Sequence, residues 1–145
     1  MTYDIYPVSS VKGPRKQDGT VAYCVRGTEG RESWEKTFQT SIKGMNADGS
    51  TLFALVRALK YIDGVKQKAD EVKIHTECSY VRMGFFQMKR WKDLGWITAR
   101  GNTVKNKGLW ELTDEMLQGN AVSFVNDADE TLLRLWKAVD RRTKW

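Results

Sequence analysis

The chain has little of the chemistry that metal centres and disulfide frameworks require. It contains one histidine, His75, and two cysteines, Cys24 and Cys78, which are 54 residues apart. This spacing excludes a Cys-x-x-Cys metal motif, and a single histidine argues against a histidine-based metal site. The first residues, MTYDIYPVSS, show no charged-then-apolar export pattern. We therefore expect a cytoplasmic protein with reduced thiols.

Long hydrophobic runs are also missing. No apolar stretch approaches the ~18 residues of a membrane-spanning helix, so no membrane partner is expected. A hydrophobic fraction of 41% and an aromatic fraction of 11% are nevertheless enough for a packed core. The length of 145 residues predicts a single domain over residues 1–145.

The net charge is positive, +6 from 24 basic and 18 acidic residues, which favours polyanionic partners such as nucleic acid. One basic cluster is interleaved with tryptophans, a combination that suits sugar-phosphate backbones. It contains Lys89, Arg90, Trp91, Lys92, Trp96, Arg100, Lys105, Lys107 and Trp110. A second basic cluster, in residues 134–144, has the equally good alternative of a solvated helix face.

The first half of the chain predicts an antiparallel meander followed by a helix. Strand-like composition occurs at residues 3–6, 21–25 and 34–42, and turns are predicted at 13–14, 18–19 and 27–31. Apolar residues then recur at helical spacing from Leu52 to Ile62, with Asp48 or Ser50 as the expected N-cap.

The second half is mainly helical around two short strands. Strands are predicted at 72–74 and 121–125, and helices at 80–87, 88–94, 109–116 and 132–139. The third of these helices is expected to turn one face inward, formed by Leu109, Leu112, Thr113 and Met116. The whole layout is an alternating α/β one.

Two motifs in the second half carry a resemblance to a known family. Residues 76–81 read Thr-Glu-Cys-Ser-Tyr-Val, and residues 104–110 read Val-Lys-Asn-Lys-Gly-Leu-Trp. They resemble the Thr-Asp-Ser-x-Tyr-Val and Val-Lys-Asn-x-x-Leu-Trp motifs of the type 1 ribonuclease H family. The resemblance implies an α/β, ribonuclease H-like fold: a five-stranded mixed sheet, with three antiparallel strands plus two parallel ones, and helices on both faces.

Enzymes of that family cleave the RNA strand of an RNA–DNA hybrid with two magnesium ions held between carboxylates. Such ions repel each other and need several anionic oxygens around them. At the four matching positions this chain has Val8, Thr51, Glu77 and Asp129. A valine cannot bind a cation, and a threonine is a poor substitute for a carboxylate. The resemblance therefore implies a relative that is degenerate at its catalytic carboxylates, with no confident catalytic residue and no expected cofactor.

Other carboxylates leave an alternative open. Asp48 lies one helical turn before Thr51, so Asp48, Glu77 and Asp129 could form a relocated site for Mg²⁺ or Mn²⁺ in a residually active enzyme. Asp129 also has the alternative role of a helix N-cap, beside Glu130.

The residues that bind substrate in the family are better retained in this chain than the metal-binding carboxylates. Asn106 matches an asparagine that holds a DNA phosphate, Asn46 stands near its companion, and Lys43 and Lys105 lie close by in sequence. Residues 91–96 match a basic handle that touches the DNA backbone. The nucleic-acid-binding residues implied are Lys43, Asn46, Lys89, Arg90, Trp91, Lys92, Trp96, Lys105 and Asn106. Alternatively, at least two of the handle tryptophans pack the handle against the body, and Asn106 caps the next helix.

Three functions follow from these observations. The first is a non-catalytic domain that binds RNA–DNA hybrid or structured RNA. The second is a protein-interaction or regulatory module on the same fold, because fold does not determine function. The third is an active ribonuclease H with relocated metal ligands.

Overall fold

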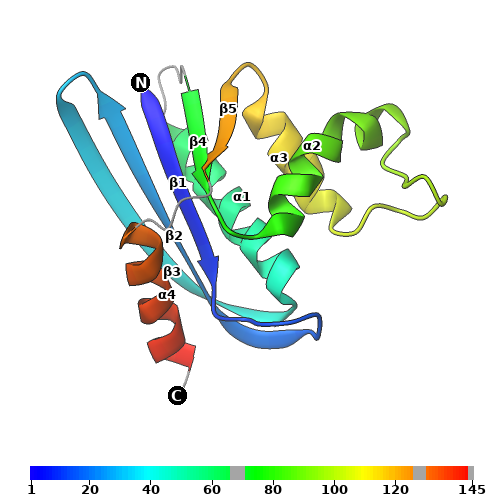
Figure 1. Cartoon of the computed structure of the whole chain (residues 1–145), viewed down its shortest axis with the longest axis horizontal. Coiled ribbons are helices and arrows are strands. Elements are labelled where there is room, and N and C mark those ends of the chain that lie inside the picture. Colours follow the sequence, from blue (N-terminus) through cyan, green and yellow to red (C-terminus); the bar gives the residue numbers. More distant parts are fainter. Residues whose placement is uncertain (66–70, 126–129, 144–145) are drawn as a thin grey trace.

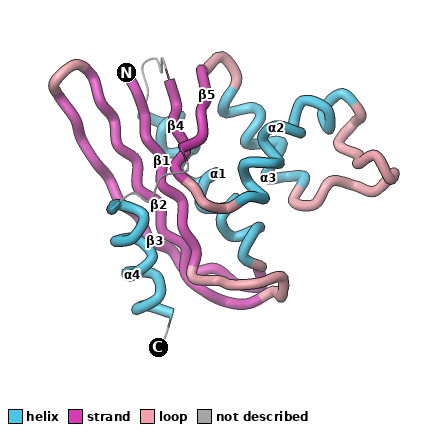
Figure 2. Tube along the Cα trace, in the orientation of Figure 1, coloured by secondary structure: helices cyan, strands magenta, loops and turns pink. Residues whose placement is uncertain are grey.

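The computed structural model of the chain describes residues 1–65, 71–125 and 130–143. Five strands form one sheet in the order β3-β2-β1-β4-β5 (Figures 1 and 2). The strands are β1 (Thr2–Ser9), β2 (Gln17–Glu29), β3 (Glu32–Met45), β4 (Glu71–His75) and β5 (Ala121–Val125). β2 pairs antiparallel with both β1 and β3, whereas β4 pairs parallel with both β1 and β5. The predicted mixed sheet is confirmed.

Four helices cover the sheet on its two faces, as predicted (Figure 1). They are α1 (Ala47–Val65), α2 (Ser79–Asp93), α3 (Lys107–Leu117) and α4 (Glu130–Thr143). The first three share one apolar core with the sheet, and α4 packs on the opposite face. None of the described helices is long and apolar enough to cross a membrane.

The central strand β1 explains why two cores form. Its side chains alternate between the faces, so Tyr3 and Ile5 are buried under α1 while Tyr6 and Val8 are buried under α4. A strand covered on both faces is apolar at nearly every position. This layout brings the end of β1 to the place where α1 begins and α4 passes.

One predicted turn is shorter than expected, and another is wrong. β2 and β3 continue through most of the predicted turn at 27–31, and the hairpin closes over Gly30 and Arg31 alone. Gly30 has φ +60°, which a tight two-residue turn requires. Residues 18–19 lie inside β2, where the pairing register shifts, and the Asp18 carboxylate accepts a hydrogen bond from Gly44 N at 3.0 Å. Cross-strand pairing therefore overrides the local turn preference of Asp-Gly.

The two helices predicted at 80–87 and 88–94 are one continuous helix, α2. Its buried residues are Val81, Gly84 and Met88, which recur at helical spacing across the expected break. Packing of this single stripe against the core keeps the helix uninterrupted.

The inward face of α3 also differs from the prediction. The buried residues are Trp110, Thr113 and Leu117, so Thr113 is buried as expected, while Leu109 and Met116 are only partly buried at the margin of the core. The fully buried indole of Trp110 dominates this orientation, because an aromatic ring buries more apolar area than a leucine.

Candidate functional site

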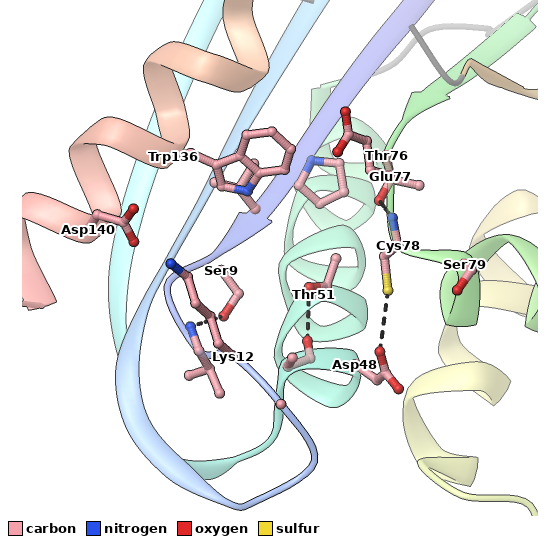
Figure 3. A pocket seen from close by; sticks show the side chains of 15 residues that line it. Ser9, Lys12, Asp48, Thr51, Thr76, Glu77, Cys78, Ser79, Trp136 and Asp140 are labelled. Atoms are coloured by element: carbon pink, nitrogen blue, oxygen red, sulfur yellow. Dashed lines mark hydrogen bonds between the residues drawn. The ribbon is translucent and has the colours of Figure 1, made fainter. Parts of the chain in front are cut away.

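A cavity of about 620 Å³ opens where β1 ends (Figure 3). We name it the carboxylate cavity for the acids in its wall. Its walls come from the end of β1, the loop that follows, the first turn of α1, the end of β4 and the second half of α4. The lining side chains are Pro7, Val8, Ser9, Val11, Lys12, Gly13, Ala47, Asp48, Thr51, Thr76, Glu77, Cys78, Ser79, Trp136 and Asp140.

The structure brings three of the four predicted metal positions together in this cavity: Val8, Thr51 and Glu77. The side chain of Val8 is only 1% exposed and belongs to the apolar cluster under α4. The Thr51 hydroxyl donates a hydrogen bond to the Ala47 carbonyl at 2.9 Å, within its own helix. Neither position offers an anionic oxygen to a cation.

The carboxylates of the cavity come from three elements. Asp48 lies on α1, Glu77 follows β4, and Asp140 lies on α4. Asp140 is absent from the sequence prediction, although its position four residues after Trp136 places both on one face of the amphipathic helix. The predicted Asp129 lies outside the described residues.

These carboxylates do not fit a two-ion centre. Within residues 1–65, 71–125 and 130–143, no three His, Cys, Asp or Glu side chains are arranged so that they could hold a metal ion. Two divalent ions close together need several anionic oxygens gathered around them. Asp48, Glu77 and Asp140 are too few for this and are not gathered at one point. The predicted degeneracy agrees with this arrangement.

The thiol of Cys78 faces the carboxylate of Asp48, with Sγ and Oδ1 3.6 Å apart. Burial raises the pKa of this thiol, and the negative charge of Asp48 raises it further. Both effects disfavour the thiolate, which is the reactive form. The raised pKa therefore favours the protonated thiol of Cys78.

His75 lies on β4 away from this cavity. Its Nε2 is 2.7 Å from Oδ1 of Asp4, and its ring stacks on Tyr6 with 4.2 Å between centroids. The other ring nitrogen, Nδ1, is buried and has no hydrogen-bond partner within the part of the chain that the structure describes. The ring is thus held in place by one hydrogen bond and one stacking contact.

A second cavity, of about 340 Å³, lies on the other side of the start of α1. We name it the amide–lysine cavity, and its lining is Lys16, Gly44, Met45, Asn46, Gly49, Lys105 and Asn106. Asn46, Lys105 and Asn106 thus meet as the resemblance implied. Lys43 is exposed on β3 and does not line this cavity. Lys16, from the loop before β2, takes part instead and was missed because it is distant in sequence.

The amide side chains in this cavity have defined partners. Asn46 Oδ1 accepts a hydrogen bond from Gly49 N at 2.8 Å, so Asn46 caps α1 and the predicted Asp48 or Ser50 caps are wrong. Asn106 has a left-handed backbone, φ 58°, and its side chain does not cap α3. Its Nδ2 instead donates to the Tyr80 hydroxyl at 3.1 Å. Asn106 therefore occupies the N-cap position of α3 without the side-chain hydrogen bond of a cap.

The handle is anchored to the body by its tryptophans. Trp91 packs edge-to-face on the buried Trp110, with 5.7 Å between ring centroids, and both Trp91 and Trp96 pack against the core. Lys92 pairs with Asp114 on α3 at 2.9 Å, which occupies one of the predicted binding cations. Lys89 and Arg90 remain exposed on α2. The packing role that we expected for at least two tryptophans is present.

Comparison with known proteins agrees with this architecture. The sequence model of RNase H matches residues 5–126, which is most of the chain. The chain belongs to the RNase H family. The Ribonuclease H of Francisella philomiragia subsp. philomiragia is 29% identical over 119 residues, covering 75% of this chain and 78% of that relative.

Solved structures are similar in fold. LC9-RNase H1, a type 1 RNase H with the type 2 active-site motif, superposes with a TM-score of 0.72 at 18% identity, over 99% of this chain and 70% of that one. LC11-RNase H1, solved in complex with RNA/DNA hybrid, gives a TM-score of 0.61 at 18% identity, over 96% and 94%. At this level of identity the likeness establishes the fold alone.

Proposed function

We propose that this protein is a nucleic-acid-binding member of the RNase H family that does not hydrolyse its ligand. The observation that carries the proposal is the side chain of Val8. It stands on the central strand where the family's chemistry needs a carboxylate, and it is buried in the apolar cluster under α4. A carboxylate there would have to be desolvated, so the apolar packing and the metal site exclude each other.

The binding chemistry is supported by the amide–lysine cavity and the handle. Lys16 and Lys105 bring two cations, and Asn46 and Asn106 bring amides, to one cavity whose lining contains no acid among the described residues. Such a set suits a phosphate, and the net charge of +6 favours association with a polyanion. A relative in fold, LC11-RNase H1, was solved with an RNA/DNA hybrid, which supports hybrid as the first ligand to test.

One experiment follows binding and cleavage together. The purified protein is titrated into labelled RNA–DNA hybrid, duplex DNA and duplex RNA at low salt, with Mn²⁺ or with chelator, and anisotropy and strand length are measured. We expect hybrid binding that weakens steeply with salt, and intact strands. Failure of all three ligands to bind would end the proposal, and cleavage that chelator abolishes would replace it.

A second candidate is a nuclease with relocated ligands. It is favoured by one observation, that Asp48, Glu77 and Asp140 line the same cavity. It requires that the protein cleave hybrid in the presence of Mg²⁺ or Mn²⁺, and that Asp48→Asn, Glu77→Gln and Asp140→Asn each abolish this cleavage. Asp129→Asn is tested as well, because the sequence implied this position. Asp63→Asn, an exposed acid near the other end of α1, is the control that must keep the activity.

A protein partner is supported by a different surface. Phe86 is 74% exposed and Met83 is 58% exposed on α2, and Phe86 contacts Phe85 and Phe124 as a small aromatic cluster. Exposed apolar patches of this kind mark interaction sites in many proteins. Nuclease-resistant capture of a partner that Phe86→Lys abolishes would support this role.

A further inference from the structure

The two cavities lie on opposite sides of one helical turn. In the first turn of α1, Ala47 and Asp48 line the carboxylate cavity, while Asn46 and Gly49 line the amide–lysine cavity. The two cavities are therefore separated across the helix, by its diameter of ~10 Å. A nucleic acid bound at one cavity would therefore interact electrostatically with the charged residues of the other.

The charges of the two linings are opposite. The carboxylate cavity has three acids, Asp48, Glu77 and Asp140, and one base, Lys12. Among the described residues, the lining of the amide–lysine cavity has two lysines and no acid. A phosphate is attracted to the second lining and repelled by the first, since three carboxylates outnumber one ammonium group.

Lys12 offsets only part of this repulsion. Its backbone carbonyl accepts a hydrogen bond from Gln17 Nε2 at 2.7 Å, and the next carbonyl, of Gly13, accepts one from Ala47 N at 3.1 Å. The loop is thus fixed against α1, and the Lys12 side chain extends into the cavity (Figure 3). One ammonium group leaves an excess of two carboxylates among the described residues that line the cavity.

Among the three acids Asp140 is the best placed to repel a phosphate. Asp48 and Glu77 are exposed, whereas Asp140 is half-buried on α4, where solvent and salt screen its charge less. Figure 3 shows its carboxylate directed toward the cavity from the wall formed by α4.

We propose that the carboxylate cavity repels a second phosphate backbone and that Asp140 is the main source of this repulsion. The protein then binds one strand at the amide–lysine cavity and gains no affinity from the complementary strand. The inference rests on the proposed function and narrows its ligand class: a single strand is bound as well as a duplex made from it. In an enzyme of this family, metal ions would neutralise such acids, and the described residues provide no group that could hold one.

The test is a ratio of two affinities. A labelled DNA strand and the hybrid that it forms with complementary RNA are titrated at low salt against wild type, Asp140→Asn and Asp63→Asn. The control removes the same charge from the distal part of α1, about 22 Å along the helix from Asp48. Thermal unfolding checks that both variants fold.

In wild type we expect the two ligands to bind within about twofold of each other. Repulsion in water between the Asp140 carboxylate and a phosphate of the second strand ~6 Å away corresponds to about threefold in affinity. Asp140→Asn should therefore increase the affinity for the hybrid by about threefold and leave the affinity for the single strand unchanged. Asp63→Asn should leave the ratio unchanged. Two results overturn this inference alone. The first is wild-type protein that binds the hybrid much more tightly than the single strand, and the second is a hybrid-to-strand affinity ratio that is the same for Asp140→Asn as for the control. Binding of neither ligand to wild type overturns the proposed function with it.

Discussion

The indole nitrogen of Trp110 donates a hydrogen bond to the hydroxyl of Tyr80 at 3.0 Å, which ties α3 to α2. The same hydroxyl accepts from Asn106 Nδ2 at 3.1 Å and donates to the Lys105 carbonyl at 3.1 Å. One phenolic oxygen thus connects the buried core with the amide–lysine cavity. The two sequence motifs of the second half meet at this atom.

Tyr80→Phe should therefore affect stability and binding together. It leaves the buried indole N–H of Trp110 without its acceptor, which should lower the free energy of unfolding by about 1–3 kcal/mol. Release of Asn106 should also weaken nucleic-acid binding. Urea unfolding and anisotropy measure the two effects. Tyr61→Phe is the matched control, because no hydrogen bond of the Tyr61 hydroxyl is found within the described residues. Equal effects of the two variants would contradict the assignment.

Gly84→Ala should destabilise the protein although alanine favours helices. A Cβ at Gly84 would overlap the ring of the fully buried Trp110, which has no room to move. Overpacking of this kind costs about 1–3 kcal/mol. The control is Gly108→Ala in α3, where a Cβ meets nothing within 4 Å and helix propensity should stabilise by up to ~1 kcal/mol. Urea midpoints that move in the same direction for both variants would argue against the contact.

Stability should fall in alkaline solution because of Cys24. Burial, and then its hydrogen bond to Glu35, raises the pKa of this thiol from 9.0 to about 11. A raised pKa means that the unfolded chain loses its proton first, so the stabilisation is complete below pH 9 and is lost as the pH rises toward 11. Between pH 8 and 10 the loss should be about 1 kcal/mol. Urea unfolding of wild type and Cys24→Ser at several pH values measures this loss of stability. Parallel pH profiles of the two proteins would exclude ionisation of the Cys24 thiol as its cause.

Lys16 and Lys43 should differ in their contribution to binding. Lys16 lines the amide–lysine cavity, whereas Lys43, which the sequence resemblance implied as a binding residue, does not. Lys16→Gln should reduce the slope of log affinity against log salt by about one, and Lys43→Gln should leave it unchanged. A salt titration of hybrid binding gives both slopes. A larger loss for Lys43→Gln would move the phosphate site to β3.

Much of the fold is predictable from local patterns, and the misses share one cause. β4, β5, α1 and α4 were predicted because their apolar spacing is set by neighbours in the chain. The break expected within α2 and the turn expected at 18–19 followed local residue preferences. Tertiary packing overrode them, through the Val81 to Met88 stripe in the first case and through pairing with β3 in the second.

The candidate site divides in the same way. Val8, Thr51 and Glu77 were located from motifs and do meet in one cavity. Asp140, Lys12 and Lys16 were not found, because each reaches its cavity from an element or loop far away in sequence. Periodicity assigns a residue to a helix face but does not say which other element that face meets.

The order of residues was sufficient to establish the RNase H layout, the loss of two central carboxylates and the positive net charge, since these depend on side-chain identity and spacing along the chain. Only folding in three dimensions decided that an acidic and a basic hollow share the first turn of α1, and that α4 contributes Asp140 to the acidic one. Charge acts through space, and distances through space are set by how the helices pack on the sheet.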